Sequence, residues 1–189
     1  MKIIRTMCLA FLILHSAARF TDAQEIPTKS PQASPASVPE EKQRSERETR
    51  KRLEQLACGP EGVHFAHHTE KSSQPLPEQT PDKALIYVIR NGSMVGAAMQ
   101  AKFAMDGKWV GMNRVSNYFY IEASPGPHYF CVDAGSRGLL SLVVEKGATY
   151  YLQQRITMGG TDLDLIDAEK GKEYVAKYHR SIFVEKLKN

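Results

Sequence analysis

Residues 102–131, KFAMDGKWVGMNRVSNYFYIEASPGPHYFC, decide the fold because they place two tight turns between segments of alternating character. Asp106-Gly107 predicts a two-residue type I′ hairpin, since both central residues of that turn need a positive φ and glycine adopts it without steric cost. Ser124-Pro125-Gly126-Pro127 predicts a second reversal, because each proline fixes φ and removes a backbone donor. We therefore expect a strand on each side of both turns.

The segments around this stretch predict further strands and one late helix. Ala84 to Ile89, ALIYVI, is apolar at every position, which is typical of a central strand covered on both faces. Alternation of apolar and polar residues resumes toward the C-terminus until Glu169 to His179, where the period becomes helical. We expect a mainly β fold, a small antiparallel β-sandwich of seven to eight strands, with a C-terminal helix and a charged N-terminal helix outside the domain.

The first residues have the order of a cleavable secretory signal. Lys2 and Arg5 precede the apolar run MCLAFLIL, which is followed by small residues up to Ala23. We expect cleavage near Ala23, with Ala18 as the alternative. The run is too short for a membrane span, which needs about 20 apolar residues. The sequence therefore predicts an extracytoplasmic protein, periplasmic or secreted, with no stable membrane span.

Net charge and cysteine content indicate which classes of partner and which cellular compartment suit the chain. The formal net charge is +4, and loss of Lys2, Arg5 and Arg19 together with Asp22 lowers it to about +2. Such a weak basic balance does not indicate nucleic-acid binding, which calls for a basic stripe with stacking aromatics. The exported chain keeps Cys58 and Cys131, and an even pair in an oxidising compartment predicts a disulfide.

Composition divides the chain into six segments. A Pro/Ser-rich leader poor in apolar residues is typical of disorder, whereas the following run of strong helix formers with both signs of charge predicts a solvated helix. The expected segments are a signal peptide at 1–23, a leader at 24–39, a charged helix at 40–57, a Cys/His-containing linker at 58–81, the β-sandwich at 82–180 and a tail at 181–189.

Four sequence blocks, KALIYVIR, FAMDGKWVGMN, NYFYIEASPGPHYFC and EKGATYYLQQRI, together resemble the bacterial domain-of-unknown-function family 2846 over roughly residues 82 to 180. The resemblance implies a secreted or lipid-anchored envelope protein with a small β-sandwich of transthyretin-like outline. It implies no catalytic residues. The match of Ala57-Cys58-Gly59 and of His128 to Cys131 to features of a subgroup supports the disulfide. This chain lacks a lipidation cysteine after its apolar run.

Two chemical alternatives remain at the level of sequence. Cys58, His64, His67 and His68 are zinc-type ligands within eleven residues, but adjacent His67 and His68 would point to opposite faces of a strand, and an oxidised Cys58 could not bind metal. We therefore expect no cofactor, and a metal-binding module is the alternative function.

A hydrolase is the weaker alternative. Ser93 lies between Gly92 and Gly96, which lacks the glycine spacing of a nucleophile elbow. His128 follows Pro127 at a strand entry, where we expect it to pack against Tyr118 or Tyr150. The acidic run from Asp162 to Glu169 is interleaved with apolar residues, which predicts a solvent-facing strand followed by a helix cap rather than a calcium loop.

Aromatic side chains are the remaining candidates for a binding surface. Strand alternation leaves half of such residues facing outward, although packing in the core is the competing interpretation. The candidates are Trp109, Tyr118, Tyr120 and Tyr151. The sequence thus predicts a non-catalytic extracytoplasmic module that binds another cell-envelope component, either a protein or a glycan; its oligomeric state is open.

Overall fold

The computed structural model describes residues 37–71 and 75–186, and its central strand is the apolar segment identified above. Strand β2 spans Ala84–Arg90, and all seven of its residues are buried. It lies between β5 (Asn117–Ala123), to which it is antiparallel, and β8 (Thr149–Thr157), to which it is parallel. The prediction of a central strand covered on both faces is confirmed.

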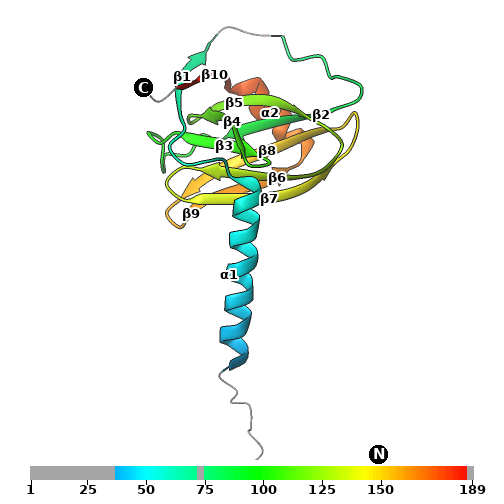
Figure 1. Ribbon diagram of the computed structural model, residues 1–189. Helices are drawn as coiled ribbons and strands as arrows, with labels where there is room; N and C mark the ends of the chain where they lie inside the picture. Colours follow the sequence, from blue (N-terminus) through cyan, green and yellow to red (C-terminus); the bar gives the residue numbers. More distant parts are fainter. Residues whose placement is uncertain (1–36, 72–74, 187–189) are drawn as a thin grey trace, which may run out of the picture. The chain divides into compact units, whose positions relative to one another are not determined.

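The strands form two sheets (Figure 1). A six-stranded sheet has the order β1-β10-β5-β2-β8-β9, and a four-stranded sheet has the order β4-β3-β6-β7. The remaining strands are β1 (His64–Glu70), β3 (Ala101–Met105), β4 (Lys108–Asn113), β6 (Gly126–Asp133), β7 (Arg137–Val144), β9 (Gly160–Ile166) and β10 (His179–Lys186). The helices are α1 (Ser37–Ala57) and α2 (Ala168–Lys177).

The main core lies between the two sheets. Ile86 and Phe119 from the six-stranded sheet meet Phe103 and Phe130 from the four-stranded sheet, and all four side chains are buried. The rings of Phe103 and Phe119 cross edge to face, with centroids 5.9 Å apart. Packing of this kind accounts for the sandwich, because each sheet buries one apolar face against the other.

The two turns behave differently. Asp106 and Gly107 have φ values of 51° and 78°, so the type I′ hairpin between β3 and β4 is confirmed. The proline turn reverses the chain, but its two arms do not pair: β5 belongs to the six-stranded sheet and β6 to the four-stranded sheet. Proline at positions 125 and 127 removes two ladder donors, so the turn carries the chain from one sheet to the other.

The mainly β class, the two layers and both helices are confirmed, whereas the details of the sheets differ from the prediction. Among the described residues there are ten strands rather than seven or eight, and two of the pairings, β2 with β8 and β10 with β5, are parallel. The six-stranded sheet also extends beyond the predicted limits of 82 and 180, since it includes β1 and β10. All seven residues of β1 pair with residues 180–186 of β10.

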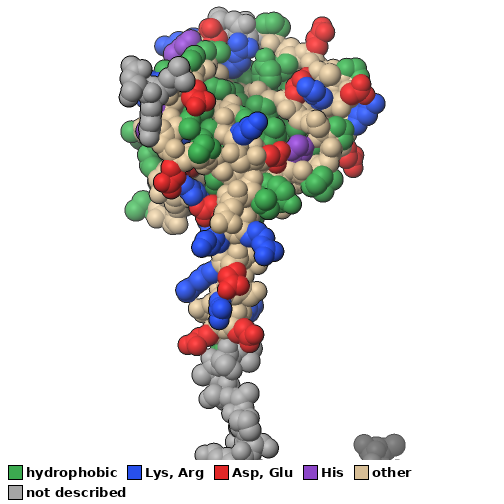
Figure 2. Space-filling view, viewed as in Figure 1, with side chains coloured by type: hydrophobic (Ala, Val, Ile, Leu, Met, Phe, Trp, Pro, Cys, Tyr) green, Lys and Arg blue, Asp and Glu red, His purple; other side chains and the backbone are tan. Residues whose placement is uncertain are grey.

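Helix α1 is highly charged and mostly exposed. It begins at Ser37, inside the segment predicted as leader; the predicted signal and residues 24–36 lie outside the described residues. Figure 2 shows side chains of both charge signs along this helix. No helix in the described part of the chain is both long and apolar enough to cross a membrane.

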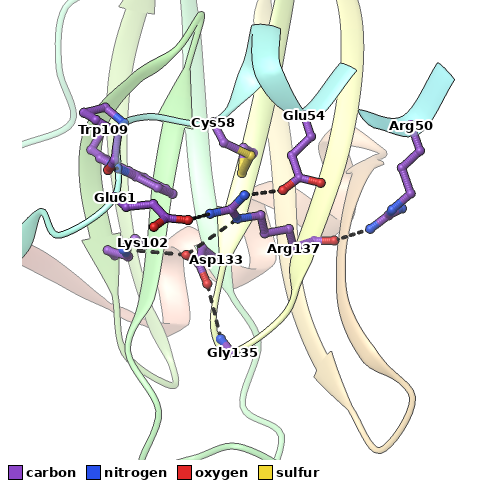
Figure 3. The surroundings of a disulfide bond; sticks show 11 residues. Arg50, Glu54, Cys58, Glu61, Lys102, Trp109, Asp133, Gly135 and Arg137 are labelled. Atoms are coloured by element: carbon purple, nitrogen blue, oxygen red, sulfur yellow. Dashed lines mark hydrogen bonds and ion pairs between the residues drawn. A yellow bond between two sulfur atoms is a disulfide. The ribbon is translucent and has the colours of Figure 1, made fainter. Parts of the chain in front are cut away.

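The C-terminal end of α1 is fixed to the four-stranded sheet by the predicted disulfide (Figure 3). Cys58 is bonded to Cys131 of β6, with 5.0 Å between their Cα atoms. Ala57 packs beside this bond in a small second core. The helix therefore enters the domain as a covalently anchored element.

Arg137 of β7 ties the last turns of α1 to the same sheet (Figure 3). Its guanidinium forms ion pairs with Glu54 and, at 3.6 Å, with Glu61. Its carbonyl oxygen accepts a hydrogen bond of 2.7 Å from the side chain of Arg50. These contacts orient α1 where the disulfide alone would leave it free to rotate.

His128 braces the Asp106-Gly107 hairpin against the proline turn. Its Nδ1 lies 2.6 Å from Oδ2 of Asp106, and its Nε2 lies 2.7 Å from the carbonyl oxygen of Ser124. Burial lowers the pKa of His128, but the hydrogen bond to Ser124 and the hydrogen bond and charge of Asp106 outweigh it, so that the pKa is raised above 6.5. His128 and Asp106 are 22 positions apart, and no sequence pattern predicts their contact.

We predict that replacing both cysteines by alanine lowers the free energy of unfolding by up to about 4 to 5 kcal/mol, because the crosslink removes loop entropy from the unfolded chain across a separation of 73 residues. Urea unfolding of the Cys58→Ala/Cys131→Ala chain and of the wild type, each with and without reductant, measures this. Reductant should lower the free energy of unfolding of the wild type and leave that of the double variant unchanged. Equal stability of all four samples would contradict the predicted contribution.

We predict that His128 stabilises the fold most at acid pH. A histidine whose folded pKa is raised contributes fully below its unfolded pKa of 6.5, and the contribution is lost as pH rises through the folded pKa. The difference in unfolding free energy between wild type and His128→Gln should shrink as the pH rises above 6.5 and through the raised folded pKa. Burial lowers the pKa of His67, which has the opposite effect on stability. Because both proteins contain His67, that effect cancels in the difference. A difference that grows with pH would be incompatible with the charged pair.

Candidate binding site

The outer face of the six-stranded sheet, turned away from the main core, carries a cluster of tyrosines. Alternation along β2 sends Ile86 and Val88 into the main core and leaves Leu85, Tyr87 and Ile89 on this outer face. The neighbouring strands β5 and β8 add Tyr118 and Tyr151. These apolar and aromatic side chains require a cover, because the strands bearing them are central.

Helix α2 supplies that cover, and its N-terminus follows from the sequence. Asp167 caps the helix: its Oδ1 accepts a hydrogen bond of 2.8 Å from the Lys170 amide, as the strand-and-cap interpretation of the acidic run predicted. Val175 is buried in the tyrosine cluster. Gly171 lets the helix approach closely, since a Cβ at this position would lie 2.1 Å from Cγ of Tyr151.

The tyrosine rings form one contiguous cluster around Tyr87. The rings of Tyr87 and Tyr151 are stacked, with centroids 5.2 Å apart and an interplanar angle of 7°. Tyr118 and Tyr120 contact the same ring at centroid distances of 6.1 and 6.0 Å. The cluster is therefore a packed and preformed floor rather than a set of independent side chains.

A pocket of about 410 Å³ opens above this floor, beside the C-terminal half of α2. Tyr87, Tyr118 and Tyr151 line its base, and Val175 and Ala176 of the helix line one side. The remaining lining residues lie around these, namely Glu70, Lys71, Leu76, Lys172, Lys177, Tyr178, His179 and Arg180. A volume in this range is typical of small-molecule sites, which span about 300 to 1,000 Å³.

The floor tyrosines are neutral hydrogen-bonding groups. Burial, reinforced by Tyr151, Tyr118 and Tyr120, raises the pKa of Tyr87 to about 12. Burial also raises the pKa of Tyr118 and of Tyr151, although the charge of Arg180 opposes the shift at Tyr118. All three phenols are therefore protonated at neutral pH and can donate.

The floor hydroxyls are available to a ligand. The hydroxyl of Tyr178 accepts a hydrogen bond of 3.2 Å from the Gly92 amide. In contrast, those of Tyr87, Tyr118 and Tyr151 form no hydrogen bond within residues 37–71 and 75–186, and they are not among the fully buried unpaired atoms. Hydroxyls that face a pocket in this way are ready to exchange water for ligand.

The rim of the pocket is positively charged. Lys71, Lys172, Lys177 and Arg180 line it, and none of them forms an ion pair within the described part of the chain. The carboxylate of Glu70 also lines the pocket. Four cations against one anion attract negatively charged groups, most strongly where the floor excludes water.

Part of the chain is similar to a known family. Residues 80–165 match the model of the family described as protein of unknown function DUF2846. An uncharacterized protein of Haemophilus influenzae is 24% identical over 120 residues, which cover 60% of this chain and 71% of that protein. No solved structure matches the chain.

The DUF2846 match covers β2 through β8 and nearly all of β9, so it includes the tyrosine floor of the pocket. Tyr87, Tyr118 and Tyr151 lie inside it. The lysines of α2 and Arg180 of β10 follow it in sequence. The pocket is thus assembled from the family domain and from segments outside the matched residues.

The predicted aromatic surface is only partly brought together. Tyr118 and Tyr151 line the pocket, and Tyr120 joins the same cluster without lining it. Trp109 lies on the four-stranded sheet, is only 8% exposed and donates a hydrogen bond of 2.6 Å from Nε1 to the Pro60 carbonyl. Gly59 covers its ring, because a Cβ there would lie 2.5 Å from the indole. Trp109 therefore does not belong to the tyrosine surface.

The sequence candidates for a metal site are dispersed. Cys58 is oxidised in the disulfide, and His67 points toward Ser181, with 3.1 Å between Nε2 and Oγ. His64 and His68 are exposed on β1. Among the described residues, no three His, Cys, Asp or Glu side chains come close enough to hold a metal ion.

The hydrolase candidates also have separate partners. Ser93 Oγ accepts a hydrogen bond of 3.2 Å from the Val95 amide, whereas the imidazole of His128 is engaged by Asp106 and Ser124. Both ring nitrogens of His128 are thus engaged by groups other than Ser93. The described geometry thus contains no Ser93–His128 dyad.

Sequence reasoning missed most of the pocket. Tyr87 lies in the apolar run that predicts a buried strand, and no sequence pattern singles out the cations of α2 and β10 as binding residues. Gly171 was the available signal, since a glycine inside an otherwise helical pattern indicates close approach of another element. The opposing surface, however, could not be named from sequence.

We predict that Gly171→Ala destabilises the fold by about 1 to 3 kcal/mol, because the new methyl group would overlap the Tyr151 ring. Helix propensity alone predicts the opposite sign, a gain of up to about 1 kcal/mol. Urea unfolding of both chains therefore distinguishes close packing from propensity. A more stable Gly171→Ala protein would show that α2 does not press on Tyr151.

Proposed function

We propose that this chain is a non-catalytic extracytoplasmic module whose pocket beside α2 binds another cell-envelope component. The observation that carries the proposal is one preformed hollow that brings together three tyrosine hydroxyls and four cations, none of which has a hydrogen-bond or ion-pair partner among the residues that the structure describes. Unpaired cations and hydroxyls gathered in a pocket contribute little to folding, whereas they can contribute strongly to recognition.

The lining favours binding over catalysis. Phenols whose pKa is raised stay protonated at neutral pH, so Tyr87, Tyr118 and Tyr151 are poor bases and nucleophiles. They are good hydrogen-bond donors to a bound molecule. The proposed role is therefore to retain a ligand unchanged.

Two features support a location outside the cytoplasm. The first residues have the order of a secretory signal, and the Cys58–Cys131 disulfide is of the kind that persists in oxidising compartments. In this proposal the leader and α1 set the reach of the module, and a 21-residue helix adds about 30 Å.

A capture experiment with charge-reversal variants tests the proposal. The purified chain is immobilised and exposed to an envelope extract of the organism that encodes it. We expect Lys172→Glu/Lys177→Glu to retain at least tenfold less of the component that the wild type retains, because two attractive rim charges become repulsive. Both positions are exposed, so the fold should survive, which circular dichroism checks.

The matched control is Lys42→Glu/Lys51→Glu, which makes the same charge change at exposed positions of α1. It should retain as much as the wild type. Equal losses in both double variants would indicate unspecific charge attraction and refute a pocket site. Retention of nothing by the wild type would refute the binding role.

A further inference from the structure

We infer that the ligand of the pocket is an anionic saccharide, a sugar unit that bears a carboxylate or a phosphate. This inference rests on the proposed function and specifies the chemistry of its ligand. Three properties of the site carry it: the charge of the rim, the hydroxyl groups of the floor, and the absence of a free strand edge in the floor.

Charge selects an anion. Arg180 pairs with Tyr118 across the β10–β5 ladder, so a guanidinium and a phenol hydroxyl lie at neighbouring positions of the floor. Lys172 and Lys177 extend over the same hollow from α2. The C-terminal end of α2 contributes about half a unit of negative charge and the Glu70 carboxylate one unit, which the four rim cations outweigh.

The hydroxyl groups of the floor select a ligand rich in hydroxyls. Each phenol can both donate and accept, which matches the hydroxyl groups of a sugar. Val175, Ala176 and Leu76 supply apolar surface against which the C–H face of a sugar ring can pack. The pocket volume of about 410 Å³ suits one or two sugar units.

The topology disfavours an extended peptide. The three floor strands are all internal: β5 pairs with β2 and β10, β2 with β5 and β8, and β8 with β2 and β9. Their backbone N–H and C=O groups are already hydrogen-bonded to neighbouring strands, so a peptide could not add a strand here. Recognition must instead come from side chains, as it does for saccharides.

Titration calorimetry at low salt tests the inference with five probes: D-glucuronate, glucose 6-phosphate, glucose, inorganic phosphate and triglutamate. The sample is the purified chain with its disulfide intact. We expect at least one anionic sugar to bind at least tenfold more tightly than glucose, inorganic phosphate or triglutamate. Tightest binding by inorganic phosphate or triglutamate, or binding of none of the five, would overturn the inference.

Two pairs of variants localise the binding. Lys177→Gln should weaken it about tenfold, whereas Lys108→Gln, which removes an exposed cation from β4, should not. Tyr118→Phe removes a floor hydroxyl and keeps the ring, so we expect a loss of about fivefold. Its control, Tyr129→Phe on the four-stranded sheet, should bind as the wild type does. Equal losses within either pair would refute the site.

The outcome also separates this inference from the proposed function. If envelope capture depends on Lys172 and Lys177 but no anionic sugar binds, the binding role stands and the saccharide assignment is wrong. If the charge-reversal variant captures as much as the wild type, both the proposed function and the saccharide assignment are wrong.

Discussion

Strand β2 must be covered on both faces, and the rest of the structure follows from that requirement. Seven consecutive buried residues leave no solvated side. Ile86 and Val88 are covered by the four-stranded sheet, and Leu85, Tyr87 and Ile89 by α2. Burial of such side chains contributes roughly 1.5 to 3 kcal/mol each, so neither cover can be lost without a large loss of stability. Because α2 has only ten residues, it covers part of a broad sheet, and the pocket lies beside its C-terminal half, where Tyr87, Tyr118 and Tyr151 line the pocket.

The four-stranded sheet meets a similar requirement on its other face. Ala104, Trp109 and Cys131 point away from the main core and would meet water if the chain began at β2. The segment from Ala57 to Phe65 covers them, and the disulfide fixes that segment in place. Both aromatic groups are buried, since Trp109 is 8% exposed and Tyr87, Tyr118 and Tyr151 are 4 to 7% exposed. They differ in hydrogen bonding: the indole of Trp109 donates to the Pro60 carbonyl, whereas the three phenol hydroxyls form no hydrogen bond to any residue that the structure describes.

Local sequence signals predicted the elements well and their assembly less well. Asp106-Gly107, the apolar run of β2, the charged helix and the Cys58–Cys131 pair each depend on short-range chemistry or on an even count of cysteines, and all appear in the structure. Parallel pairing of β2 with β8, the joining of β10 to β5, and the Asp106–His128 contact depend on segments that meet only after folding. The pocket needs the two parallel pairings, since β2, β5, β8 and β10 carry its floor and Arg180, and it also needs α2, which supplies one side. Of its residues only Tyr118 and Tyr151 were predicted as a binding surface, and only because alternation leaves some aromatics facing outward.

The central claim is that recognition takes place on the tyrosine floor beside α2, and amide chemical-shift mapping tests it most directly. In a ¹⁵N spectrum of the labelled chain titrated with D-glucuronate or glucose 6-phosphate, the account predicts shifts concentrated in β5, β8 and α2. The indole signal of Trp109, the single tryptophan of the chain, should stay unchanged because it lies on the other sheet. Shifts centred on Trp109 and the β3–β4 hairpin, or spread evenly over the surface, would contradict the account.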